Sequence, residues 1–214
     1  MIEINSLRYT FQTNGFSIQI PALRTITSGI TALVGKNGAG KTTLLSLLSG
    51  MLHFTEGEVK IFDKDIRNYD NFSFIKQKIF YLPDENILFD SLTIKENFEL
   101  FGDIRFNCKN EWLKYNDIVA YFGLDEYINM PFRQCSHGTR KKAEIVCVFI
   151  SSAEIIYLDE PFNGLDIISI KLLNDILKDR LNNKCIIISA HIVDILERIA
   201  QRVLILDKGV IIDD

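Results

Sequence analysis

Apolar positions along the chain follow two patterns, one typical of β-strands and one typical of α-helices. Near the N-terminus, Ile2–Ile4 and Phe16–Ile20 alternate with period two, which predicts half-buried strands. Continuous runs rich in β-branched residues predict strands buried on both faces, as in a parallel sheet. These runs are Ile30–Val34, Ile155–Leu158 and Cys185–Ile188. Further strands are predicted at 58–62, 78–82, 203–206 and 210–212, the last two as a closing hairpin.

Helical spacing of apolar side chains predicts a second set of elements between these strands. They cover 41–52, a capped start at Thr93, and the stretches 111–122, 140–150, 168–181 and 192–199. Strands that alternate with helices favour an α/β fold around a mainly parallel sheet. The stretch from about 84 to 150 has no strand signals, so we expect a helical lobe within a single domain, 1–214. The rest of that domain, 1–83 and 151–214, then forms the core and its β subdomain.

Amino-acid composition limits the cellular compartments and the binding partners that can be expected. With 214 residues, of which 47% are hydrophobic, the chain can bury a proper core in one domain. A net charge of −4 gives no general attraction to polyanions, so no nucleic acid partner is expected. The longest apolar run, Ile145–Ile150, is too short to span a bilayer, so any membrane-spanning part would belong to another chain. A reduced cytosolic setting is expected from four cysteines without metal or redox spacing, Cys108, Cys135, Cys147 and Cys185.

The segment Gly35–Thr42 carries the clearest chemical signal. It fits the pattern G-x-x-x-x-G-K-[ST] and lies between a predicted strand and a predicted helix. Glycines let successive backbone N–H groups turn toward phosphate oxygens, and the following helix presents its positive end to the same anion. Lys41 is then placed to reach the β- and γ-phosphates, and the Thr42 hydroxyl to ligate Mg²⁺. The residues predicted to contact nucleotide here are Gly35, Asn37, Gly38, Ala39, Gly40, Lys41, Thr42 and Thr43.

Two carboxylates follow the buried strand Ile155–Leu158. Ligands of parallel sheets bind at the carboxyl ends of the strands, so Asp159 and Glu160 are delivered to the binding edge. We expect Asp159 to hold Mg²⁺ through water. Glu160 is predicted to be the general base that polarises a water molecule for attack on the γ-phosphate.

In order and spacing these motifs resemble the nucleotide-binding domain of ABC ATPases, over nearly the whole chain. Gly35–Thr42 corresponds to Walker A, and Ile155–Glu160 to Walker B with its following glutamate. Asn163–Asp166 resembles the D-loop, and Ser189–His191 the switch-histidine loop. Ser136–Thr139 stands where the family has its signature motif. The resemblance implies a P-loop NTPase core with a mainly parallel sheet, an N-terminal antiparallel β subdomain and a small helical subdomain.

The family resemblance also implies how the pocket is completed. Such domains pair head to tail around two ATP molecules, each held by Walker A of one subunit and the signature of the other. Ser136 and Gly138 would supply the signature contacts and Asp166 the D-loop contact. His191 would bind the γ-phosphate beside Glu160 and Lys41.

Adenine in this family usually stacks on an aromatic residue near the N-terminus. Phe11 aligns best with that position and Tyr9 is the alternative. For either residue, a place in the core of a strand is an equally good interpretation.

Several positions depart from the usual family residues, among them Cys135, which replaces a leucine before the signature. Asp84 stands where the Q-loop glutamine is expected, and a carboxylate there can still ligate Mg²⁺. In the signature, His137 replaces a glycine and Thr139 the glutamine. The acid at the Q-loop position and His137 within Ser136–Gly138 are similar to those of ATPases that work with ABC-2-type membrane subunits.

The sequence therefore predicts the ATP-hydrolysing subunit of an ABC transporter, with ATP and Mg²⁺ as ligands. It would act as a homodimer, or paired with another ABC ATPase subunit, at the cytoplasmic face of the cell membrane. A separate integral membrane permease would carry the transport, with export favoured. The alternative left open is an ABC ATPase without a transport role, in cofactor assembly or on ribosomes or DNA. An unrelated P-loop enzyme is disfavoured because the later motifs follow in family order.

Overall fold

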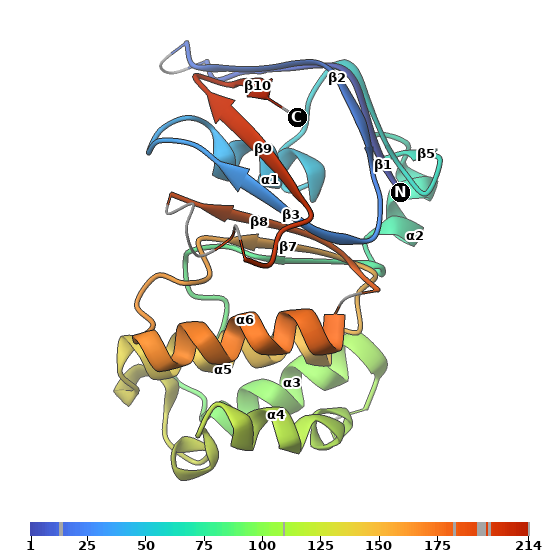
Figure 1. Cartoon of the computed structure of the whole chain (residues 1–214). Helices are drawn as coiled ribbons and strands as arrows, with labels where there is room; N and C mark the ends of the chain where they lie inside the picture. Colours follow the sequence, from blue (N-terminus) through green and yellow to red (C-terminus); the bar gives the residue numbers. More distant parts are fainter. Residues whose placement is uncertain (13–14, 109, 182, 192–195, 197, 214) are drawn as a thin grey trace.

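Two β-sheets and a group of helices form the layers of the structure, a computed structural model (Figure 1). It describes residues 1–12, 15–108, 110–181, 183–191, 196 and 198–213. The antiparallel sheet lies on one side of helix α1 (Lys41–Leu48), and the larger sheet lies on the other. Helices α5 (His137–Ile150) and α6 (Ile167–Leu181) cover the opposite face of the larger sheet, and further helices lie beyond them.

The smaller sheet is antiparallel, with four strands in the order β2-β1-β4-β5. Its strands are β1 (Ile2–Thr10), β2 (Ser17–Ile26), β4 (Glu56–Ile61) and β5 (Lys64–Asp65). Both N-terminal strands are longer than their alternating runs suggested, because polar residues continue the pairing of β1 with β2. The implied N-terminal antiparallel β layer is confirmed.

The larger sheet has six strands in the order β10-β9-β3-β8-β7-β6 and is parallel except for the β9–β10 hairpin. Its strands are β3 (Gly29–Val34), β6 (Ile79–Leu82), β7 (Ile155–Asp159), β8 (Cys185–Ala190), β9 (Arg202–Asp207) and β10 (Val210–Asp213). Every residue of β7 and β8 is buried, which explains their unbroken apolar sequences. The predicted mainly parallel sheet is confirmed. Its register sets Asp159 opposite Ser189 at the carboxyl edge, where the predicted site lies.

The remaining helices begin and end near sequence signals. Thr93 and Glu96 form a reciprocal capping box at the start of α3, as the sequence predicted. These helices are α2 (Tyr69–Ile75), α3 (Ile94–Phe106) and α4 (Asn116–Tyr121), with short 3-10 helices at Glu111–Tyr115, Asp125–Tyr127 and Phe132–Gln134. No helix among the described residues is long and apolar enough to cross a membrane.

Several boundaries differ from the predicted ones. Helix α1 ends at Leu48 rather than at residue 52, because Gly50 turns the chain with a φ of 77°. The helix predicted over 111–122 divides into a 3-10 turn and α4. Neither β5 nor α2 was predicted, since segments of two and seven residues are too short to show a clear period. The helix predicted over 192–199 falls mostly outside the described residues.

Gly57 in β4 offers a test of how tightly the antiparallel sheet is built. Its φ is 91°, and a Cβ there would lie 2.2 Å from the Ser6 carbonyl oxygen. We expect Gly57→Ala to lower the free energy of unfolding by on the order of 3 kcal/mol, through backbone strain and the clash. Gly123→Ala is the control, because its φ of 65° is also positive but nothing lies within 4 Å. Urea denaturation measures both, and equal losses would contradict the role given to the close contact.

Candidate functional site

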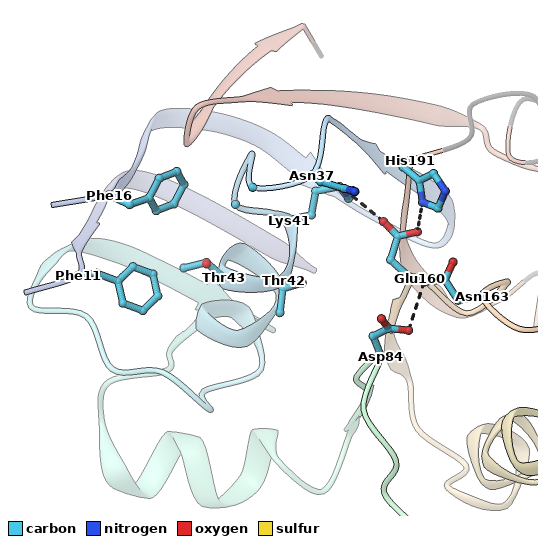
Figure 2. Close-up of a pocket in the computed structure, with 12 residues that line it drawn as sticks. Phe11, Phe16, Asn37, Lys41, Thr42, Thr43, Asp84, Glu160, Asn163 and His191 are labelled. Carbon is cyan, nitrogen blue, oxygen red and sulfur yellow. Dashed lines mark hydrogen bonds and ion pairs between the residues drawn. The ribbon is translucent and has the colours of Figure 1, made fainter. Parts of the chain in front are cut away.

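A pocket of about 620 Å³ opens at the carboxyl edge of the larger sheet. The turn before α1, the ends of β6 and β7, and the loops after β1 and β8 contribute its walls (Figure 2). It brings together predicted residues that are up to 180 positions apart in sequence, from Phe11 to His191. Its lining residues are Phe11, Phe16, Asn37, Gly38, Gly40, Lys41, Thr42, Thr43, Asp84, Glu160, Asn163 and His191.

The phosphate loop depends on glycine at two positions. A Cβ on Gly35 would lie 2.3 Å from the Leu206 carbonyl oxygen of β9. Gly40 has a φ of 106°, and a Cβ there would lie 2.5 Å from Ile18 Cδ1. Glycine alone fits this left-handed, crowded turn, which leads directly into the N-terminus of α1. The backbone N–H groups of that helix end are therefore available to an anion.

Lys41, the first residue of α1, is buried at 6% exposure and directs its ammonium group into the pocket (Figure 2). Its Nζ donates to the Gly35 carbonyl at 2.8 Å and lies 3.3 Å from Glu160 Oε1. A buried ammonium with one carbonyl and one carboxylate partner is a strong cation for an incoming phosphate. The predicted lysine is thus already linked to the predicted general base.

Glu160 follows β7 in a left-handed backbone conformation, with a φ of 47°. Such a conformation in a residue other than glycine costs free energy and occurs often at functional sites. Ser189 holds it, since the Glu160 N–H donates to the Ser189 hydroxyl at 2.9 Å. The carboxylate then points toward two partners, Lys41 through one oxygen and His191 Nδ1 at 2.9 Å through the other. Glu160 is therefore held between a cation and an imidazole at the pocket wall.

Asp159 lies one residue earlier and is fully buried. One carboxylate oxygen accepts a hydrogen bond from the Ser189 hydroxyl, and the other accepts one from Tyr81 Oη at 3.4 Å. Burial raises the pKa of Tyr81 to about 12, so its hydroxyl keeps the proton that it donates. A second cavity beside the first is lined in part by Thr42, Asp84 and Asp159. The three predicted Mg²⁺ ligands thus share one wall.

Their donor atoms fit Mg²⁺. A hydroxyl and carboxylates are hard oxygen ligands, the type that Mg²⁺ prefers. Over the described part of the chain, no group of three or more His, Cys, Asp or Glu side chains is placed to hold a metal alone. Mg²⁺ usually takes one or two carboxylates and completes its octahedron with phosphate oxygens and water. The site therefore suits a metal that arrives together with a nucleotide.

Two phenylalanines flank the far end of the pocket from Glu160 (Figure 2). The predicted Phe11 is one of them. The other, Phe16, was missed because it was assigned to the strand that begins beside it. Their ring centroids are 6.4 Å apart. Tyr9, the alternative to Phe11, does not line the pocket and instead packs edge-on against Phe11 with centroids 5.0 Å apart.

Other predicted site residues lie around the pocket rather than in its lining. Ala39 is buried behind the loop, and Gly35 contributes its carbonyl to Lys41. Ser136 and Gly138, at the start of α5, and Asp166, in the segment after β7, are not among the residues that line the pocket. Asn163 was not predicted, yet its side chain donates to Asp84 Oδ1 at 3.3 Å. Its position in the D-loop pattern was the one signal that pointed to it.

Comparison with known proteins settles the family. The sequence profile described as ABC transporter matches residues 23–163, which is more than half of the 214 residues. The chain belongs to the ABC transporter family. It is 33% identical over 182 residues to the uncharacterized ABC transporter ATP-binding protein MJ1023 of Methanocaldococcus jannaschii. The aligned region covers 84% of this chain and 64% of that protein. The chain is also 33% identical over 181 residues to the mouse retinal-specific phospholipid-transporting ATPase ABCA4, which covers 84% of this chain but 8% of that protein.

Solved structures of ABC cassettes share the fold. One titled as the ATP-binding subunit of an ABC transporter superposes with a TM-score of 0.87 at 23% identity, covering 99% of this chain and 88% of that one. The cassette MJ0796, solved as a dimer in a post-hydrolysis state with ADP and Pi, gives 0.85 at 21% identity, covering 100% and 97%. These likenesses confirm the ABC ATPase fold that the motifs implied.

Proposed function

We propose that this ABC family member is the ATP-binding and ATP-hydrolysing subunit of a transporter. One observation carries the proposal, namely the contact series from Lys41 through Glu160 to His191 at the mouth of the phosphate loop. In this series Glu160, the candidate general base, contacts both a phosphate-binding cation and an imidazole. A lysine that binds the phosphates and a carboxylate that orients or deprotonates water are recurring parts of ATP hydrolysis.

ATP would bind with its phosphates against the loop 35–43 and its base against the aromatic residues Phe11 and Phe16 at the far end of the pocket. The N–H groups at the start of α1 and the Lys41 ammonium favour the triphosphate charge. Thr42 and Asp84 would hold Mg²⁺, with Asp159 acting through water. When bound there, Mg²⁺ would neutralise negative charge that develops on the phosphate oxygens during transfer.

Glu160 acts in the proposed hydrolysis as the general base. Its Oε1 is paired with Lys41 in the structure. Triphosphate competes for that ammonium, so binding of substrate frees the carboxylate to accept a proton from water. His191 Nδ1 lies 2.9 Å from the other carboxylate oxygen of Glu160. The imidazole therefore stays beside the attacking water molecule and helps to orient this water toward the γ-phosphate.

The proposed pocket is completed by a second ABC subunit, identical or paired. Ser136 and Gly138 stand at the exposed start of α5, outside their own pocket, as does Asp166 of the D-loop. Ser136 caps α5 by accepting from the Thr139 N–H at 3.1 Å. A capped helix end of this kind suits an anion presented from another subunit. Closure of two subunits on ATP would thus complete two equivalent pockets.

The proposed partner in transport is a separate integral membrane subunit of the ABC-2 type, with export as its direction and this chain at the cytoplasmic face. Relatives named phospholipid-transporting ATPases support the transport role, and Asp84 together with His137 in the signature supports the ABC-2 type. Affinity purification of the tagged chain from its native membranes should recover an integral membrane protein. Recovery of ribosomal or other soluble partners alone would contradict the transport role.

Adenine binding gives a direct test of the aromatic end. We expect Phe11→Ala and Phe16→Ala each to raise the Kd for ATP about tenfold, since stacking of a base on an aromatic ring contributes roughly 1–3 kcal/mol. Fluorescent ATP titration measures the change. The affinity for inorganic triphosphate, which has no base, should stay the same. A larger loss in Tyr9→Ala than in Phe11→Ala would place the base on Tyr9 instead.

A further inference from the structure

A buried ion pair lies in the helical layer, outside the pocket lining. Four charged side chains are buried among the described residues, and two of them, Lys41 and Asp159, belong to the candidate site. The other two are Lys141, at 1% exposure, and Glu144, at 0%. Both lie on α5, three positions apart, with Lys141 Nζ 3.6 Å from Glu144 Oε2. A charge pair this deep requires a reason, because desolvation of both ions is costly.

The pair holds the segment that follows β6 at two points. Lys141 Nζ donates to the Asp84 backbone carbonyl at 3.2 Å and lies 3.9 Å from Asp84 Oδ1. Glu144 Oε1 accepts from the Ile87 N–H at 2.9 Å. Segment 84–87 is therefore fastened at both ends to one turn of α5. Its first residue is the carboxylate that lines the pocket beside Thr42.

Stability alone does not explain the arrangement. A buried ion pair is often matched or exceeded in stability by apolar residues of similar size. A pair of this kind fixes the relative orientation of the two segments that it joins, because each buried charge tolerates few positions of its partner. Here the two parts that it orients are the pocket carboxylate Asp84 and the helix that begins at the signature residue Ser136.

We propose that the Lys141–Glu144 pair is a positioning device that sets the Mg²⁺ affinity of Asp84 according to the orientation of α5. This inference rests on the proposed function, in which Asp84 ligates Mg²⁺ and α5 presents the signature to a second subunit. Lys141 and Glu144 then connect two sites. One is the Mg²⁺ bound in this subunit's pocket, and the other is the signature that α5 presents to the pocket of the second subunit. Lys141 and Glu144 touch neither nucleotide nor metal, so they act only by positioning.

The test uses the charge-neutral double variant Lys141→Met with Glu144→Leu, built in a hydrolysis-blocked Glu160→Gln background. The Mg²⁺ concentration at half-maximal binding of fluorescent ATP should rise about tenfold, the lower range for loss of groups that hold a metal ligand. ATP affinity without Mg²⁺ should change by less than about twofold, because Lys41 and the loop are untouched. Mn²⁺ binding, followed by electron paramagnetic resonance, gives the same comparison independently of hydrolysis.

The matched control is Lys95→Met with Glu99→Leu, which removes the 3.8 Å surface ion pair of α3. Its Mg²⁺ midpoint should equal that of the parent. Should the apolar pair fail to fold, Lys141→Gln with Glu144→Gln keeps hydrogen-bonding groups at both positions and should also raise the midpoint.

Three results would contradict the inference. The inference is overturned if the folded Lys141/Glu144 double variant keeps the Mg²⁺ midpoint of the parent. It is also overturned if that variant loses metal-free and metal-dependent ATP binding equally. Either result leaves the proposed function standing. Absence of Mg²⁺-dependent ATP binding in the parent overturns the proposed function, and this inference falls with it.

Discussion

Glu160→Gln is expected to lower ATP turnover at least 100-fold, because general-base catalysis typically contributes about 10²- to 10⁴-fold. The amide keeps the size of the side chain but cannot accept a proton from water. Mg-ATP binding should persist, since the phosphate loop and Lys41 are unchanged and the cation loses a competing carboxylate. Phosphate release measures turnover, and fluorescent ATP titration measures binding in the same samples.

The same variant should trap the closed pair of subunits. With hydrolysis blocked, Mg-ATP remains between the two faces and holds them together. Light scattering should show a monomer without nucleotide and a dimer with Mg-ATP, if the homodimer is the functional unit. Glu154→Gln is the control, because Glu154 lies at the other end of the same strand and pairs with Lys78. Parent-level turnover in Glu160→Gln would show that another group acts as the base.

The parts of the site that the sequence predicted are those dictated by local geometry. Gly35 and Gly40 can be identified because only glycine fits the crowded turn of a phosphate loop. The unbroken apolar run before Asp159 predicted a strand buried on both faces, and the register of β7 with β8 does set that residue at the binding edge. In each case the signal lies within a few residues of the position that it identifies.

Features created by packing between distant segments were out of reach. Phe16 reads as part of a strand, and only the turn after β1 brings it opposite Phe11 in the pocket. Lys141 lies in a basic run that is typical of a solvated helix start, yet the segment around Asp84 buries it. Neither position carries a period or a motif that could have shown its partner. The end of α1 was missed for a smaller reason, since the apolar pattern continues past Gly50.

Lys41→Met is expected to weaken ATP binding itself, whereas Glu160→Gln keeps binding and loses turnover. Removing one partner of a buried, hydrogen-bonded charge pair costs about 2–5 kcal/mol, so the Kd for ATP should rise at least roughly 30-fold. Methionine keeps most of the side-chain volume, so the packing at the start of α1 is preserved. Fluorescent ATP titration measures the loss, and Lys36→Met, in the same loop but not lining the pocket, is the control.

The nucleotide-free protein gives a second measure of the same lysine. With Lys41 gone, the Glu160 carboxylate, at 14% side-chain exposure, loses its ammonium partner and keeps the 2.9 Å contact with His191 Nδ1. Lys41→Met should therefore lower the free energy of unfolding by about 1–3 kcal/mol, and adding Glu160→Gln should recover part of that loss. Simple additivity of the two changes would mean that the contact contributes nothing, and that Lys41 does not restrain Glu160 before ATP arrives. Coupling would mean that the base is released by the same ammonium that binds the phosphate, so that binding and activation are one event.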